Sequence, residues 1–190
     1  MKRYIALIRG INISGKNKIP MNDLKLNFID LGYSNVKTYL NSGNVIFDSS
    51  TNDIDFLTEQ IENMIKIKFN IDVPVYINYF DNIKELLEHY PTWWGTDDKK
   101  IYDNIIFIIK PHTFEEVYDI LGEENKKYEK IENYKNFIFW SYELENYRKT
   151  NWWSRTINTS ISNALTIRTA NTIKKIVELG EYPIYDYFFY

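Results

Sequence analysis

The order of apolar runs and helical stretches over residues 3–80 restricts the fold of this chain more than any other feature. Apolar runs bounded by Gly, Pro and Asn predict strands, and apolar residues at spacings of three and four predict helices. The resulting order is βαββαβ, which is typical of the ferredoxin-like unit, an antiparallel sheet with helices on one face. We expect strands at residues 3–9, 36–40, 45–47 and 75–80, and helices at residues 20–31 and 53–69.

The second half of the chain shows a similar order of elements. A buried strand at 105–109 precedes a helical stripe at 114–121, and a hairpin is expected over 128–142. A mixed segment and a polar loop then lead to a helix near 170–179, with Thr169 as its N-cap. The sequence therefore predicts an α+β fold in which a second ferredoxin-like or related α+β unit follows the first. We expect domains at residues 1–90 and 101–190, with 91–100 as the linker.

The composition excludes several kinds of site. The chain has no cysteine and two histidines, so disulfides, thiol nucleophiles and zinc sites are not expected. No apolar run is long enough to span a membrane, and the N-terminus shows no secretory signal. We expect a cytoplasmic protein without metal or cofactor. The tail, residues 182–190, is so aromatic that we expect it to pack on the body or to form a homodimer contact.

The segment after the first strand, Arg9–Lys18, is the clearest candidate site. It combines two glycines, Ser, Asn and three cations. Glycines allow backbone N–H groups to approach an anion, and cations add a favourable field. An ordinary strand-to-helix connection is the alternative. Residues 10–17 also match the nucleotide-binding pattern G-x-x-x-x-G-K-[ST] except at its last position. Asn17 stands there in place of the Ser or Thr whose hydroxyl ligates magnesium. Pro20 would also interrupt the helix that such a loop must begin, so a nucleoside triphosphatase is disfavoured.

Charge is distributed unevenly along the chain. Residues 1–45 carry a net charge of +5 and residues 148–177 carry +6, whereas residues 46–147 carry −11. Two solvated basic faces would explain this pattern. The alternative is that the two basic segments meet in space and form one anion-binding face. Within the second segment, Arg148–Arg155 interleaves cations with two tryptophans, which suits either single-stranded nucleic acid or a closed core.

Candidate residues for binding an anion come from four places in the sequence. These are the loop after the first strand, the hairpin turn near Gly43, the tryptophan-containing segment and the polar approach to the last helix. The predicted ligand-binding residues are Arg9, Gly10, Asn12, Ser14, Gly15, Lys16, Asn17, Lys18, Ser42, Gly43, Asn44, Arg155, Arg168 and Asn171.

Three stretches of these residues resemble a known family. Residues 4–19, Met21-x-x-Leu24 and residues 38–47 are similar to the opening of the family called domain of unknown function 1697. Residues 153–155 and 166–175 resemble its closing motif, although Thr169-Ala170 stands where Asn-Trp is common. The resemblance implies a bacterial-type cytosolic protein of ferredoxin-like α+β architecture. It implies no activity.

Three functions remain open from the sequence. The first is a non-catalytic module whose basic face binds a phosphate-bearing ligand, either a nucleotide or single-stranded nucleic acid. The second is an enzyme for an anionic small molecule, with anchors at Arg9, Lys16 and Arg168 and a titratable group such as Tyr39, Asp48 or His89. The third is a dimeric assembly protein that uses its aromatic tail.

Overall fold

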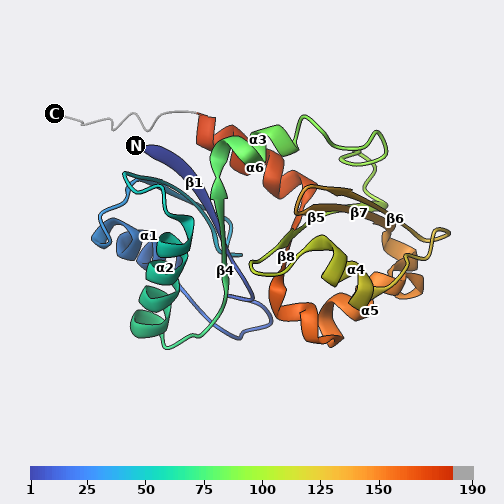
Figure 1. Ribbon diagram of the computed structural model, residues 1–190, viewed down its shortest axis with the longest axis horizontal. Coiled ribbons are helices and arrows are strands. Elements are labelled where there is room, and N and C mark those ends of the chain that lie inside the picture. Colours follow the sequence, from blue (N-terminus) through green and yellow to red (C-terminus); the bar gives the residue numbers. More distant parts are fainter. Residues whose placement is uncertain (182–190) are drawn as a thin grey trace. The chain divides into compact units, whose positions relative to one another are not determined.

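The computed structural model of the protein describes residues 1–181 (Figure 1). Two compact units are present, and each is described by itself. Unit 1 contains Met1–Lys84 together with the described residues from Lys174 onward, and unit 2 contains Glu85–Ile173. Compared with the predicted division, the first unit ends slightly earlier and also includes the end of the last helix. The aromatic tail, residues 182–190, lies outside the described residues.

Unit 1 has the predicted order of strands and helices. Its four-stranded antiparallel sheet has the order β2-β3-β1-β4, with β1 in the interior. Tyr4 of β1 is opposite Phe47 of β3 and Tyr79 of β4. The elements are β1 (Lys2–Ile8), α1 (Met21–Asp30), β2 (Ser34–Tyr39), β3 (Asn44–Ser49), α2 (Ile54–Phe69) and β4 (Val75–Tyr79), followed by α3 (Phe80–Leu86).

The core of unit 1 lies between its sheet and the helices α1 and α2, which cover one face of that sheet (Figure 1). Alternate residues of β1, Tyr4 and Ile8 among them, pack with Leu24 of α1 and Leu57 of α2. β1 is buried on both faces, and the alternation of its side chains directs Tyr4 and Ile8 to the face that the helical spacing of α1 and α2 covers. Asp53 caps α2, since its Oδ1 accepts the backbone N–H of Phe56 at 3.0 Å.

Unit 2 repeats this topology. Its antiparallel sheet has the order β6-β7-β5-β8, with β5 in the interior position that β1 holds in unit 1. The prediction of an α+β fold with antiparallel sheets is therefore confirmed. The elements are β5 (Ile101–Ile108), α4 (Phe114–Leu121), β6 (Glu129–Tyr134), β7 (Phe137–Glu143), the 3₁₀ helix η1 (Leu144–Lys149), α5 (Asn151–Asn158), the 3₁₀ helix η2 (Ser160–Ala164) and β8 (Leu165–Thr169).

Strand β8 differs from the expectation of a polar loop before the last helix. Its residues pair with β5, with Arg168 opposite Ile105 and Ile167 opposite Ile106. Leu165, Thr166 and Arg168 are all buried. Leu165–Arg168 does alternate apolar and polar residues, but this period-two run is short, and its polar members Thr166 and Arg168 are buried rather than exposed.

Helix α6 (Ala170–Glu181) begins in unit 2 and ends in unit 1. In unit 1, Arg3 donates to the carbonyl oxygen of Gly180, and the Nζ of Lys37 donates to that of Leu179 at 2.9 Å. Two cations therefore bind the carbonyl end of α6, where the helix dipole is negative. At the other end, the N–H of Thr172 donates to Thr169 Oγ1 at 3.3 Å, as expected for an N-cap.

Candidate nucleic-acid interface

The glycine loop, residues 9–19, folds back on itself as a small hairpin. The N–H of Asn12 donates to the carbonyl of Asn17 at 3.0 Å, and the N–H of Lys16 donates to that of Ile13 at 2.9 Å. Ile13 and Lys16 form an antiparallel bridge. The loop's own chain therefore uses several of the groups that the sequence predicted for an anion.

Asn12 holds the glycine loop closed. Its Nδ2 donates to the carbonyls of Ile19 at 2.9 Å and Asn41 at 2.8 Å, while its Oδ1 accepts the N–H of Ile19 at 2.8 Å. Asn17 acts similarly, with its Nδ2 donating to the carbonyl of Gly10 at 3.0 Å. Both predicted ligand residues stabilise the loop, and Asn12 also joins it to the turn between β2 and β3.

That turn supplies three more of the predicted residues. Asn44 is fully buried, and its Nδ2 donates to Ser42 Oγ and to the carbonyl of Tyr39, both at 2.9 Å. The carbonyl of Gly43 accepts the N–H of Ile8 at 2.8 Å. The structure therefore brings residues 42–44 beside the glycine loop, as the anion-site hypothesis requires, but directs their polar groups into the turn itself.

The tip of the glycine loop remains exposed. Ser14, Gly15, Lys16 and Lys18 are all exposed, whereas Arg9 is half-buried, and its burial lowers the pKa of its guanidinium. Gly15 has φ +77°, and a Cβ added there would meet no described atom within 4 Å. The positive φ, rather than close packing against a neighbouring atom, therefore favours glycine at this position. Two lysines on an open tip suit a weak, single-anion contact.

The predicted site residues of unit 2 stabilise the fold. Arg155 of α5 donates to the carbonyl of Leu121, at the end of α4. Arg168 is buried and donates to Thr166 Oγ1 at 2.9 Å and to the carbonyl of Ile167 at 2.8 Å. Burial lowers the pKa of Arg168 to about 10. The expectation that the two basic segments of the sequence meet in space stays a prediction.

The start of α6 lies in a cleft of the wrong charge for an anion. Asn171 is exposed there and helps to line a cleft of about 580 Å³. Asp97, Asp98 and Asp103 line the same cleft, and among the described residues Lys99 is its one basic lining residue. These three carboxylates offset the positive end of the helix dipole and would repel an anion. A second anion site at this helix N-terminus, as the sequence suggested, is therefore disfavoured.

A different basic surface appears around Tyr128, just before β6. The ammonium nitrogens of Lys127 and Lys149 both lie 5.2 Å from the centre of the Tyr128 ring. The Nζ of Lys130 lies 6.0 Å from the centre of the Trp93 ring. These distances are those of cation–π contacts. Both rings are half-buried and the lysines are exposed, so the group faces solvent.

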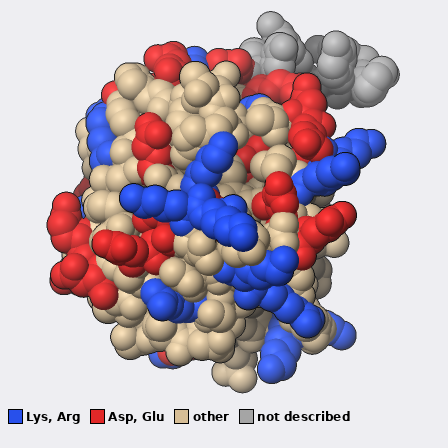
Figure 2. Space-filling model, turned by 90° about the vertical axis from the view of Figure 1, so that its right-hand side faces the viewer, with Lys and Arg blue, Asp and Glu red and all other residues tan. Residues whose placement is uncertain are grey.

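Both rings, Lys127 and Lys130 line a pocket of about 320 Å³, which we call the basic aromatic pocket, and Lys149 lies against its lining residue Tyr128. Lysine and arginine side chains gather over the middle of the face shown in Figure 2, which is the side where β6 and α5 lie in Figure 1. Burial raises the pKa of the lining residue Tyr142, with a further contribution from Tyr102, so its hydroxyl stays neutral. The pocket is lined by Trp93, Thr96, Ile101, Lys126, Lys127, Tyr128, Glu129, Lys130, Ser141, Tyr142 and Glu143.

Asn125 fixes the backbone that carries the lysines. Its carbonyl accepts the N–H groups of Tyr128 at 2.8 Å and Glu129 at 3.0 Å. Its side-chain Nδ2 donates to the carbonyl of Lys149 at 3.1 Å, which ties the end of η1 to the loop before β6. The fold therefore brings Lys127 and Lys149 to the same ring from distant parts of the sequence.

Glu129 lies within this basic surface but is 3% exposed. Its Oε1 accepts the N–H groups of Asn125 at 2.9 Å and Asn151 at 2.7 Å, and its Oε2 accepts the indole N–H of Trp140 at 2.9 Å. The carboxylate thus binds the first turn of α5, where the helix dipole favours a negative charge. Because Glu129 is buried and satisfied, it neutralises the surrounding lysines less than its formal charge suggests.

Sequence reasoning missed the basic aromatic pocket because it used net charge over long segments. Lys126, Lys127 and Lys130 lie within residues 46–147, whose net charge is −11. The segment K-K-Y-E-K at 126–130 interleaves cations with an aromatic residue and could have signalled the site. Of the four lysines at this surface, only Lys149 lies in a segment that the sequence analysis names as a candidate for binding, the tryptophan-containing segment.

Two of the other titratable candidates, Asp48 and His89, have side-chain partners within their own units. Asp48 accepts Arg3 Nε at 2.7 Å and Asn35 Nδ2 at 2.7 Å. His89 stacks on Tyr134 with ring centres 4.6 Å apart. Tyr39 ends β2 beside the turn at 42–44. Among residues 1–181, no group of three or more His, Cys, Asp or Glu side chains is arranged to hold a metal ion. No helix in the same range has the length and apolar character needed to cross a membrane.

Comparison with protein families gives one decisive match. The model of DUF1697, described as a protein of unknown function, matches residues 1–139. The chain belongs to this family. A solved structure of the conserved bacterial protein SP0830 from Streptococcus pneumoniae is similar, with a TM-score of 0.83 and 28% sequence identity. The alignment covers 95% of this chain and 99% of SP0830. The search of curated proteins gave no match. Membership of DUF1697 confirms the resemblance seen in the sequence and brings no specific function with it.

Proposed function

We propose that this protein is a non-catalytic module that binds single-stranded nucleic acid at the basic aromatic pocket of unit 2. The observation that carries the proposal is the placement of Lys127, Lys149 and Lys130 around the rings of Tyr128 and Trp93. Cations neutralise phosphates, and aromatic rings stack on bases, so this combination suits an unpaired strand. A cytoplasmic location is part of the same proposal.

The size and chemistry of the pocket favour a strand over a mononucleotide. Lys126, Lys127 and Lys130 line the pocket and Lys149 lies beside Tyr128, so four cations are available around one surface. One nucleotide offers phosphate to one or two of them, whereas a strand offers a phosphate to each in turn. A volume of about 320 Å³ admits a base between the rings and the lysine stems.

Recognition at this site is expected to depend weakly on sequence. Lysine ammonium groups act as point charges, and every base has a face that can stack. Among the lining residues, Thr96 and Ser141 carry hydroxyls that already hydrogen-bond Asp103. The lining therefore offers stacking and charge rather than a pattern of groups that reads base edges.

A binding titration tests the proposal. Fluorescein-labelled oligo(dT) of about 12 nucleotides, within the range of single-strand site sizes, is titrated with the protein at two salt concentrations. We expect saturable binding that weakens as salt rises, together with a change in tryptophan fluorescence that the Trp93→Leu variant loses. Thymidine monophosphate and a duplex of equal length serve as comparisons and should bind more weakly. Absence of saturable, salt-sensitive binding to the oligonucleotide would refute the proposal.

A further inference from the structure

Helix α2 presents two stripes of side chains, and the core uses one of them. Leu57, Ile61 and Ile65 are fully buried in the core of unit 1. The other stripe runs along the outer side and consists of Phe56, Gln60, Asn63 and Ile67. Its spacing of four, three and four residues is that of a coiled-coil seam. We call this set the outer stripe.

The ends of the outer stripe are large apolar side chains in contact with solvent. Phe56 is 52% exposed and Ile67 is 79% exposed. Between them, Gln60 accepts the hydroxyl of Tyr33 at 2.6 Å, and the side chain of Asn63 makes no hydrogen bond within residues 1–181. A seam with apolar ends and amides in the middle is suited to a partner helix that pairs amide with amide.

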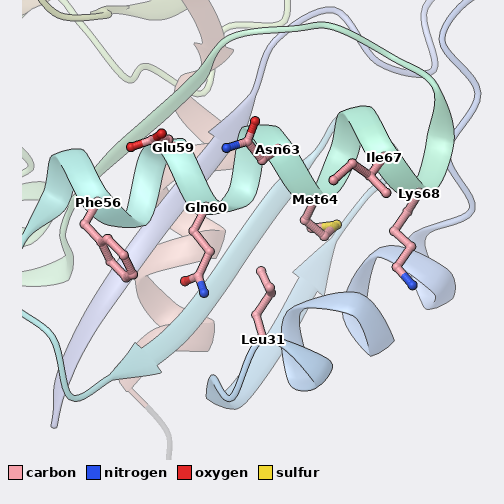
Figure 3. A pocket seen from close by; sticks show the side chains of 8 residues that line it. All are labelled: Leu31, Phe56, Glu59, Gln60, Asn63, Met64, Ile67 and Lys68. Carbon is pink, nitrogen blue, oxygen red and sulfur yellow. The ribbon is translucent and has the colours of Figure 1, made fainter.

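A groove of about 480 Å³ runs beside this stripe, between α2 and the residue that follows α1, Leu31 (Figure 3). Phe56, Gln60 and Met64 project from α2 toward Leu31, whereas Glu59 and Asn63 project from the other edge of the helix (Figure 3). The groove is lined by Leu31, Phe56, Glu59, Gln60, Asn63, Met64, Ile67 and Lys68. Another helix can therefore pack along this groove.

The charges along α2 identify the partner. Asp55 and Glu59 lie in the N-terminal half of the helix, whereas Lys66 and Lys68 lie in the C-terminal half, and all four are exposed. An antiparallel copy of α2 would place its basic half against the acidic half of the first. It would also align the two helix dipoles favourably, whereas a parallel copy would oppose like charges.

We propose that the outer stripe and its groove bind α2 of a second copy of this chain, antiparallel, to give a two-fold symmetric homodimer. Phe56 then faces the partner's Ile67, and Gln60 faces the partner's Asn63. Glu59 lies near the partner's Lys66, which shares its flank of the helix one heptad on, and the symmetry repeats each contact. This inference does not depend on the proposed binding of nucleic acid, because that pocket belongs to unit 2.

Mass in solution tests the dimer. Sedimentation velocity over about 1 to 100 μM protein should show a species of twice the 22.9 kDa chain mass that increases with concentration. Ile67→Glu should raise the dissociation constant of the dimer at least tenfold. Ile120→Glu, at an exposed position of α4 in unit 2, should leave that constant unchanged. A monomer for the unaltered protein throughout this range would overturn the proposal.

Charge reversal distinguishes this interface from other occupants of the groove. Glu59→Lys alone and Lys66→Glu alone should each weaken the homodimer, because each creates two like-charge pairs. An equimolar mixture of the two variants should dimerise again, since both pairs then have opposite signs. Failure of the mixture to recover would refute the antiparallel arrangement. Removal of residues 182–190 should not affect the mass; a monomer after that truncation would instead assign the contact to the tail.

Discussion

Lys127 and Lys149 approach the same ring, that of Tyr128, at equal distances of 5.2 Å from its centre. One comes from the loop before β6 and the other from the end of η1, and Asn125 joins the two segments by a hydrogen bond to the carbonyl of Lys149. The ring thus anchors two ammonium groups that would otherwise repel each other. A phosphate bridging them would relieve this repulsion, which makes the pair the centre of the proposed interface.

Removing these two charges is expected to weaken the binding of oligo(dT). In the double variant Lys127→Gln/Lys149→Gln, the slope of log K against log salt should become shallower by about 1.4, because each lost phosphate contact contributes about 0.7 on a single strand. Fluorescence anisotropy at several salt concentrations measures this slope.

The matched control is Lys16→Gln/Lys18→Gln, which removes the same charge from the exposed tip of the glycine loop. We expect its slope to equal that of the unaltered protein. The opposite result, loss of binding with the loop variant and none with the pocket variant, would assign the site to the glycine loop.

Glu129 is expected to be essential for the stability of unit 2. In Glu129→Gln, an amide N–H₂ replaces one carboxylate oxygen and faces backbone or indole donors that now lack an acceptor. We expect the free energy of unfolding to fall by about 2 kcal/mol or more, as for other buried hydrogen-bond networks. Urea denaturation measures this loss. Glu132→Gln, at an exposed position on the same strand, should change stability by less than about 0.5 kcal/mol.

Most of the fold could be predicted from the sequence because its signals are local. The stripes on α1 and α2, the apolar runs of β1 and β5 and the positive φ of Gly43 all follow from residues near one another in the chain. β8 was not predicted, because its apolar–polar alternation spans only Leu165–Arg168 and its pairing with β5 joins residues far apart in the chain. The hairpin expected over 128–142 is formed by β6 and β7 and turns at residues 135–136, with Lys135 at φ +53°.

The candidate site was less predictable than the fold. Asn12 and Asn17 lie in a segment whose composition suits an anion-binding loop. In the fold, however, their side chains donate hydrogen bonds to backbone carbonyls, which the sequence alone does not show. Glu129 counts as a negative charge in any sum over the sequence, although the fold buries it beneath exposed lysines. Charge on a surface depends on which side chains reach solvent, and that is a property of the folded chain.

Gly43 is expected to tolerate substitution much less than Gly15, although both have positive φ. An added Cβ at Gly43 would lie 2.9 Å from Ile8 Cβ and 2.9 Å from Ile11 Cδ1, whereas at Gly15 it would meet no described atom within 4 Å. Gly15→Ala should therefore cost about 1 kcal/mol of backbone strain. Gly43→Ala should cost about 2 to 4 kcal/mol, since overpacking adds to that strain. Thermal unfolding of the two variants measures the difference, and equal losses would contradict the close packing of the turn against β1.

The Arg3–Asp48 ion pair is expected to make the stability of unit 1 depend on acid pH. The guanidinium Nε lies 2.7 Å from Asp48 Oδ1. Burial opposes ionisation of Asp48, but the hydrogen bonds from Arg3 and Asn35 outweigh it and hold the pKa of the carboxyl below its usual range. A lowered pKa in the folded state means that the pair contributes fully above the unfolded pKa, near 4, and is lost as pH falls through the folded value.

Asp48→Asn should therefore destabilise the protein at pH 7 by about 1 kcal/mol, a figure that allows for the partial exposure of the pair. The difference between the unaltered protein and this variant should shrink as pH is lowered below about 4, because protonation then neutralises Asp48 in the unaltered protein, as the amide already does in the variant. Urea denaturation at pH 7, 5 and 3 measures the trend. Asp30→Asn, at an exposed position on α1, should show a difference near zero at each pH. A deficit for Asp48→Asn that stays constant with pH would mean that Asp48 acts through shape and neutral hydrogen bonds rather than through its charge.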